Sequence, residues 1–310
     1  MLDKIALNTK LKVNQNLIDD LFSKKILRYN PYKDGFSRQY YFGNKPEKSP
    51  YFISSGRSTR FNMSGVQTRL EVNPKHFSSY QNLINFLQQA LLHYDPHQLL
   101  LTRLDFKADV PIPFSSVLQQ AYRPGVHSFI GFFSEKGVIS ELVLGINPKA
   151  KIYDALERHG QAYSQRPLAA PQAASNPPLQ GLTRFEVSLI PKGSIRLPIA
   201  SFAELPDLLN FNPFTFYKFA KVRVPAANLS NSDHIKADHL LRIARDSKFG
   251  GMQMAKSYAR HHFSKRRQKD FDQFFEIVSP PNLFGIYQAD LRTFLSSDSY
   301  QPQNIGGIFT

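Results

Sequence analysis

Three segments of the sequence alternate between charged and apolar side chains with a period of two, and each contains the pattern Arg-x-acid. The segments are residues 69–73, 102–110 and 182–189. Side chains two residues apart lie on the same face of a β-strand, so the alternation predicts half-buried strands with one charged face. If the three strands are neighbours in one sheet, that face gathers carboxylates and guanidinium groups. The charged positions are Arg69, Glu71, Arg103, Asp105, Lys107, Asp109, Arg184 and Glu186.

The rest of the chain predicts an α+β fold, in which helices flank an antiparallel or mixed sheet. Apolar residues recur at helical spacing within 78–94, and a helix is also expected at 15–27. Residues 127–133 and 137–145 predict a hairpin, and a further strand follows at 150–154. Beyond about residue 200 the chain becomes helical and basic in character.

We expect two domains. Residues 1–225 would form the larger one and residues 226–310 a helical basic region, with the boundary near the polar run 225–232. Within the first domain, residues 164–180 are rich in Pro, Ala and Ser, which is typical of a flexible insertion.

The charge of the chain narrows the class of partner. Lys and Arg number 39 against 24 Asp and Glu, a formal net charge of +15. Clustered cations bind phosphates with release of counterions, so a nucleic acid is the expected partner. A basic soluble protein with no such partner, or one that meets an anionic membrane surface, is the alternative.

The composition also excludes several classes of protein. There is no cysteine, which excludes disulfides, thiol catalysis and cysteine-based zinc sites. No run of about 18 apolar residues occurs, so no membrane span is expected. We therefore expect a cytoplasmic protein that does not enter the membrane.

Tyr153 is the candidate nucleophile, in the strand-like run Lys-Ile-Tyr-Asp at 151–154. A tyrosine beside strand carboxylates, in a basic protein, favours attack on a DNA phosphate assisted by a divalent metal. Carboxylate oxygens suit Mg²⁺ or Mn²⁺, and arginine suits phosphate. The alternative is a tyrosine that only packs in a strand, beside acids that only form cross-strand ion pairs.

Four ordered segments resemble a known family. Residues 69–75, 102–109, 151–157 and 183–189 are similar to the motifs of rolling-circle replication initiators of small Gram-positive plasmids, and the layout also resembles that of filamentous-phage initiators. The resemblance covers roughly residues 65–190 and implies a nickase- or relaxase-like sheet. It makes Tyr153 the nucleophile. The acids that match the family's motifs or the intervening hairpin are Glu71, Asp105, Asp109, Glu141 and Glu186.

The resemblance implies a site-specific nicking-closing enzyme that leaves a 5′-phosphotyrosine and a 3′-OH primer. Mg²⁺ or Mn²⁺ would be held by some of the matching acids, and Arg103 and Arg184 would organise the acids or clamp phosphate. The family usually has lysine where Ala155 stands here. The cations that could replace it are Lys149, Lys151 and Arg158.

The expected partners are origin DNA, as a hairpin with single-stranded and duplex parts, and a host helicase, with a homodimer as one oligomeric form. The basic tail at 235–276 would contact DNA, although a solvated helix face is the alternative. Two other functions stay open: a non-catalytic nucleic-acid-binding protein, and a metal-dependent nuclease that uses water. The cations expected on the tail are Lys256, Arg260, Lys265, Arg266 and Arg267.

Overall fold

The structure, a computed structural model, divides into two compact units. Unit 1 comprises Met1–Phe106, Ser188–Phe211 and Tyr287–Thr310, and unit 2 comprises Lys107–Val187 and Asn212–Ile286. Both units combine antiparallel strand pairs with helices, which confirms the predicted α+β class. The residues that the structure describes are 1–30, 38–43, 49, 51–56, 66–126, 129–134, 137–159, 181–223, 230–246, 248, 250–262 and 274–296.

The sheet of unit 1 follows the order β2-β3-β4-β5-β1-β6. Each neighbouring pair in it is antiparallel. In β5 the apolar Leu70 and Val72 are buried while Arg69 and Glu71 remain partly exposed, as the alternation predicted. The strands are β1 (Leu2–Thr9), β2 (Leu27–Tyr29), β3 (Arg38–Phe42), β4 (Tyr51–Ser55), β5 (Thr68–Val72) and β6 (Leu100–Val110), of which β6 continues into unit 2.

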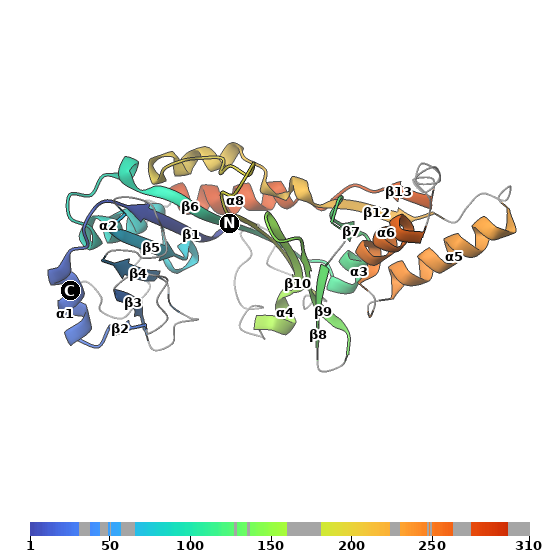
Figure 1. Cartoon of the computed structure of the whole chain (residues 1–310), viewed down its shortest axis with the longest axis horizontal. Coiled ribbons are helices and arrows are strands. Elements are labelled where there is room, and N and C mark those ends of the chain that lie inside the picture. Colours follow the sequence, from blue (N-terminus) through green and yellow to red (C-terminus); the bar gives the residue numbers. More distant parts are fainter. Residues whose placement is uncertain are drawn as a thin grey trace, which may run out of the picture. The chain divides into compact units, whose positions relative to one another are not determined.

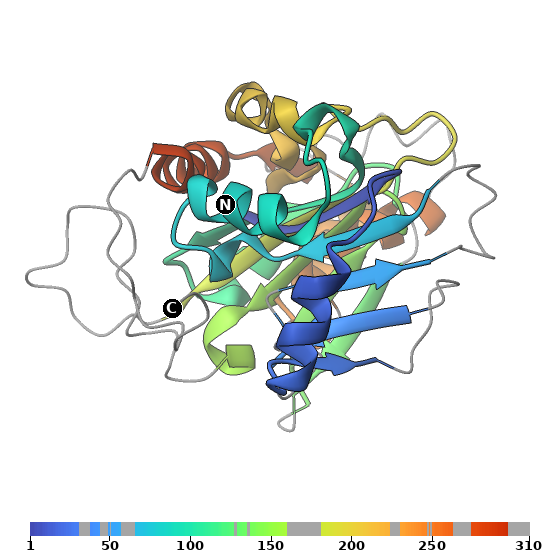
Figure 2. The same ribbon diagram turned by 90° about the vertical axis from the view of Figure 1, so that its left-hand side faces the viewer.

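Helices cover the sheet of unit 1 through aromatic contacts. Ser79 caps α2 by accepting a hydrogen bond from the backbone N–H of Asn82. The buried stripe of α2 then brings Phe86 against Tyr51 of β4, with ring centroids 4.3 Å apart. Helix α1, blue in Figure 2, lies against β2 and α2. The helical elements are α1 (Gln15–Ser23), η2 (Pro74–His76), α2 (Tyr80–Ala90), η3 (Pro96–Gln98), η5 (Phe202–Asn210) and most of α8 (Leu283–Ser296).

The main sheet of unit 2 follows the order β6-β11-β10-β9-β8, and Figure 1 shows β8, β9 and β10 side by side. The predicted hairpin is present as β8 and β9, which pair antiparallel, and β10 pairs antiparallel with β9. The strands are β8 (Phe129–Phe133), β9 (Ile139–Leu144), β10 (Lys149–Asp154) and β11 (Thr183–Leu189), and the short helix α4 (Ala155–His159) follows β10 directly.

A second layer packs on the apolar face of β11. Phe185 lies with its ring centroid 5.1 Å from that of Tyr217 and 5.9 Å from that of Phe219, so this face is core. Figure 1 shows α5 and α6 beside the three-stranded sheet β13-β12-β7. The elements of this layer are α3 (Phe114–Leu118), β7 (Ala121–Tyr122), η6 (Pro213–Phe216), β12 (Lys218–Val222), α5 (Asn231–Arg245), α6 (Gly251–His262) and β13 (Phe275–Ile277).

The two compact units differ from the predicted domains 1–225 and 226–310. Helices α5 and α6 belong to unit 2 because they pack on β12 and β7, whereas α8 from Tyr287 onward belongs to unit 1. Strands β12 and β13 were not expected from the sequence. The predicted insertion at 164–180 lies outside the described residues. None of the described helices is long and apolar enough to cross a membrane.

Gly251, the first residue of α6, allows α6 to pack closely against the end of α3. Its φ is +59°, and an added Cβ would lie 2.1 Å from the carbonyl oxygen of Leu118. We expect Gly251→Ala to lower the free energy of unfolding by about 3 kcal/mol, because backbone strain and overpacking both contribute. Gly137 has φ +69° with nothing within 4 Å, so Gly137→Ala measures the backbone strain alone, about 1 kcal/mol. Urea denaturation followed by circular dichroism compares the two; equal losses would contradict the clash with Leu118.

Candidate active site

Strands β9 and β10 place Tyr153 beside charged side chains. Residues two apart on β10 share a face, so Lys149, Lys151 and Tyr153 lie on one side of the sheet. The register pairs Lys151 with Val143 and Tyr153 with Glu141. This register therefore adds the carboxylate of Glu141 to the face that carries Tyr153.

The Tyr153 hydroxyl is held by two side chains of β11. It donates a hydrogen bond to Oε1 of Glu186 at 2.5 Å and accepts one from Nη1 of Arg184 at 3.3 Å. Arg184 in turn donates from Nε and Nη2 to the two carboxylate oxygens of Asp109 on β6, at 2.6 and 2.7 Å. A continuous chain of polar contacts thus links Asp109, Arg184, Tyr153 and Glu186 across three neighbouring strands.

This chain of contacts is buried. Tyr153 and Arg184 are each only 2% exposed, although Arg184 belongs to the charged face of its strand. A buried guanidinium is tolerated when its donors are paired, and here the bidentate contact with Asp109 pairs two of them. The predicted charged face of β11 is therefore an interior polar network in unit 2.

The environment keeps the Tyr153 phenol protonated at neutral pH. Burial raises the pKa of Tyr153 far above its ordinary value, and the negative charge of Glu186 raises it further, while Arg184 opposes the change. A neutral phenol is a weak nucleophile and needs a base within hydrogen-bond reach. Oε1 of Glu186 is the carboxylate oxygen to which the phenol already donates.

Arg158 of α4 covers the ring of Tyr153. Its guanidinium carbon lies 4.7 Å from the ring centroid, and its Nη1 lies 2.6 Å from Oε2 of Glu141. Asp154 positions the helix, because its side chain accepts hydrogen bonds from the backbone N–H groups of Leu156 and Glu157. The Arg158 side chain is 46% exposed, so it forms the outer cover of the nucleophile.

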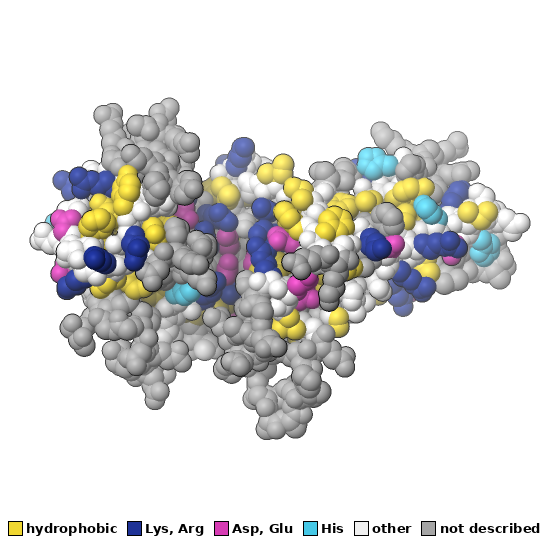
Figure 3. All heavy atoms as spheres, turned by 90° about the horizontal axis from the view of Figure 1, so that it is seen from below, with side chains coloured by type: hydrophobic (Ala, Val, Ile, Leu, Met, Phe, Trp, Pro, Cys, Tyr) yellow, Lys and Arg dark blue, Asp and Glu magenta, His cyan; other side chains and the backbone are white. Residues whose placement is uncertain are grey.

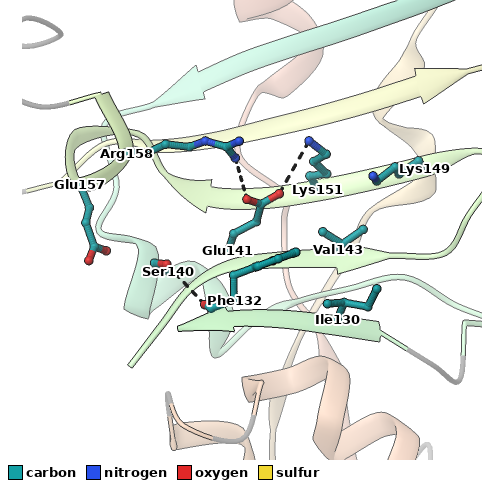
Figure 4. A pocket seen from close by; sticks show the side chains of 9 residues that line it. All are labelled: Ile130, Phe132, Ser140, Glu141, Val143, Lys149, Lys151, Glu157 and Arg158. Carbon is teal, nitrogen blue, oxygen red and sulfur yellow. Dashed lines mark hydrogen bonds and ion pairs between the residues drawn. The ribbon is translucent and has the colours of Figure 1, made fainter. Parts of the chain in front are cut away.

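Lys151 stands between two carboxylates. Its Nζ lies 3.7 Å from Oε1 of Glu141 (Figure 4) and 3.6 Å from Oε2 of Glu186. Together with Arg158, it balances the charge of Glu141. Basic and acidic side chains also lie next to one another on the face of the protein drawn in Figure 3.

A pocket of about 620 Å³ opens on this side of unit 2. Strands β8, β9 and β10 supply its floor and α4 supplies one end (Figure 4). The pocket brings cations and apolar side chains together next to the covered tyrosine. The residues that line it are Ile130, Phe132, Ser140, Glu141, Val143, Lys149, Lys151, Glu157 and Arg158.

The five acids predicted as metal ligands are divided among different partners. Glu71 and Asp105 belong to unit 1, where Glu71 pairs with Lys4 and Arg69, and Asp105 pairs with Arg103. Asp109 is occupied by Arg184. Among the described residues no cluster of three or more His, Asp or Glu side chains forms.

Glu141 and Glu186 remain as the pair of acids that could hold a cation. Both already face one cation, the Nζ of Lys151. Mg²⁺ commonly binds through one or two protein carboxylates together with water and substrate phosphate, so a metal at this pair would take the place of Lys151 between the two acids.

The basic residues predicted on the tail differ in how far they are exposed to solvent. The Nζ of Lys256 lies 3.8 Å from the ring centroid of Phe275 and 5.1 Å from that of Tyr122, inside unit 2. Arg260 is exposed on α6. Lys265, Arg266 and Arg267 lie outside the described residues.

Sequence reasoning missed two contributors to the site. The Tyr217 hydroxyl lies 2.7 Å from the carbonyl oxygen of Lys151 and 2.6 Å from that of Glu186, so it joins β10 to β11 from the core face. Phe132 lines the pocket from β8. Nothing in the local sequence distinguishes Tyr217 from other tyrosines, whereas the strand that carries Phe132 was expected as part of the hairpin at 127–133 and 137–145.

The comparisons with known proteins add no family assignment. No protein-family model matches the chain. No curated protein matches its sequence either.

Proposed function

We propose that the protein cleaves and rejoins one strand of DNA through a covalent bond to Tyr153, as a rolling-circle replication initiator does. The observation that carries this proposal is the Tyr153 hydroxyl, held between Oε1 of Glu186 and Nη1 of Arg184. An acceptor for the proton and a cation at the oxygen are the two groups that a tyrosine nucleophile requires. The net charge of +15 supports a polyanionic substrate.

In the proposed reaction the phenol oxygen of Tyr153 attacks the scissile phosphorus while its proton passes to Glu186. The bond between tyrosine oxygen and phosphorus forms as the bond to the 3′ oxygen breaks, and the leaving oxygen takes a proton from solvent. The products are a 5′-phosphotyrosine and a free 3′-OH. Rejoining is the reverse, with the 3′ oxygen as nucleophile and Tyr153 as leaving group.

Arg184 and Arg158 have different proposed roles. Arg184 is fixed by Asp109, so it orients the phenol and stabilises negative charge on its oxygen. Arg158 is half exposed and covers the ring, so an incoming phosphate would take the place of Glu141 as its partner. Lys149 and Lys151 line the adjacent pocket and would contact neighbouring phosphates. A divalent cation held by Glu141, with water and the substrate phosphate as its other ligands, would neutralise charge on the phosphate.

Trapping of the covalent intermediate tests the proposal. The full chain is incubated with labelled single-stranded hairpin oligonucleotides whose loops are randomised, in the presence of Mn²⁺. We expect an adduct that survives boiling in detergent, that EDTA prevents, and that mass spectrometry of peptides assigns to Tyr153. Cleavage without an adduct would instead indicate a nuclease that uses water. An adduct on another tyrosine, such as Tyr163, would contradict the assignment of the nucleophile.

One observation favours a second candidate function, a nucleic-acid-binding protein without catalysis. Tyr153 is only 2% exposed, as expected of a tyrosine that serves only the structure. Binding of the oligonucleotides with neither cleavage nor adduct would support this function. The predicted origin hairpin, host helicase, second copy of the chain and cytoplasmic location stay proposals of the same kind.

A further inference from the structure

Strand β8 exposes large apolar side chains beside the candidate site. Ile130, Phe132 and Phe133 are 59%, 51% and 59% exposed. Strand β8 is also the last strand in the order of its sheet. Exposed apolar residues on an edge strand favour aggregation, so proteins usually cover or charge such edges. This strand therefore has the properties of a binding surface.

The register aligns this surface with the nucleophile. Phe132 pairs with Glu141, and Glu141 pairs with Tyr153, so the three side chains form a row on one face of the sheet. Strands lie roughly 4.8 Å apart, so two strand spacings, roughly 10 Å, separate Phe132 from Tyr153 along the row. Ile130, Val143 and Lys151 form the next row on the same face (Figure 4).

The charges around Phe132 identify the chemistry of its partner. Lys149, Lys151 and Arg158 line the same pocket, and among the described residues Lys149 has no ion-pair partner. Two acids also line it, Glu141 and Glu157, of which Glu141 is already paired with Lys151 and Arg158. Cations that contact phosphates beside an exposed aromatic ring are the features by which proteins bind unpaired nucleotides.

We propose that Phe132, supported by Ile130, stacks on an unpaired base next to the phosphate that Tyr153 attacks. The site then takes single-stranded DNA, because the faces of bases inside a duplex are already covered by their neighbours. The inference rests on the proposed function, because that function places the scissile phosphate at Tyr153. Phe133 follows a register shift in the pairing of β8 with β9 and does not line the pocket that Ile130 and Phe132 line, so we do not expect it to contact this base.

Binding measured without cleavage tests the proposal. Tyr153→Phe serves as the background, and fluorescence anisotropy reports the Kd for a single-stranded oligonucleotide and for the matched duplex. We expect Phe132→Ala to weaken single-strand binding about 10-fold, Phe132→Tyr to restore it, and Phe133→Ala to leave it unchanged. Duplex binding should be the same in all four proteins. The fluorescence of 2-aminopurine placed next to the scissile phosphate should be quenched by the background protein and not after Phe132→Ala.

Three results would overturn the stacking role: unchanged single-strand affinity in Phe132→Ala, an equal loss of duplex affinity, or a dimer in sedimentation that Phe132→Ala dissociates. The last would assign β8 to contact between copies of the chain. These results are separable from failure of the proposed function. An adduct in the unmodified protein together with unchanged binding in Phe132→Ala would reject only the stacking role, whereas altered single-strand binding without any adduct would reject only the nicking reaction.

Discussion

Replacement of Tyr153 by phenylalanine is expected to abolish the covalent protein–DNA adduct and to slow strand cleavage by at least about 1,000-fold. The ring remains to fill its buried position, so the protein should stay folded. The loss of the hydrogen bond to Glu186 should lower the free energy of unfolding by only about 1–2 kcal/mol. Denaturing gels with end-labelled oligonucleotide measure the rate, and circular dichroism checks the fold.

Two further variants test whether the loss of activity is specific to Tyr153 and whether Glu186 accepts its proton. Tyr29 is 42% exposed on β2 of unit 1, so Tyr29→Phe should leave cleavage unchanged. Glu186→Gln keeps the shape of the side chain but removes the base, so it should slow adduct formation by about 100- to 10,000-fold. Full activity in Tyr153→Phe would reject the nucleophile. Full activity in Glu186→Gln would reject only the proton acceptor.

Removal of the buried guanidinium should be the most costly change to the stability of the fold. Arg184 and Asp109 form a bidentate pair, and Arg184 is 2% exposed. Arg184→Met removes both hydrogen bonds that the Asp109 carboxylate accepts from the guanidinium, so we expect the free energy of unfolding to fall by about 3–5 kcal/mol. Urea denaturation followed by circular dichroism measures the loss.

A double variant separates the contribution of the ion pair to stability from the contribution of side-chain packing. Replacing both partners, Arg184→Met with Asp109→Leu, should recover much of the lost stability, because both charges of the bidentate pair are removed together. Arg242→Met is the control, since Arg242 pairs with Asp238 on α5 at 78% and 57% exposure and should cost at most about 0.5 kcal/mol. A double variant as unstable as the sum of its single variants would contradict this account.

Much of the fold could be predicted from local pattern. The strands at 69–73, 102–110 and 182–189 follow from the period-two alternation of their side chains, and the hairpin before β10 was also expected from the sequence. The helix at 78–94 follows from apolar spacing. The division into units could not be predicted, because α5, α6 and α8 are assigned by packing against residues distant in the sequence.

The candidate site was only partly predictable. Tyr153 and Arg184 were expected, whereas Glu186, expected as a metal ligand, accepts the hydrogen bond of Tyr153. The segments Thr-Arg-Leu-Glu-Val at 68–72 and Thr-Arg-Phe-Glu-Val at 183–187 are nearly identical, so the sequence does not distinguish their functions. Tyr217 and Phe132 became visible only once the neighbouring strands were known.

By itself, the sequence determined the class of fold, the basic charge and three strands with the pattern Arg-x-acid. The tertiary structure decided which of those strands carries the site. Arg69 and Arg103 turn to the acids of their own strands, Glu71 and Asp105. Arg184 reaches Asp109 on the neighbouring strand, which leaves Glu186 for Tyr153. The choice of partner depends on strand order and register, which contacts between distant parts of the chain establish.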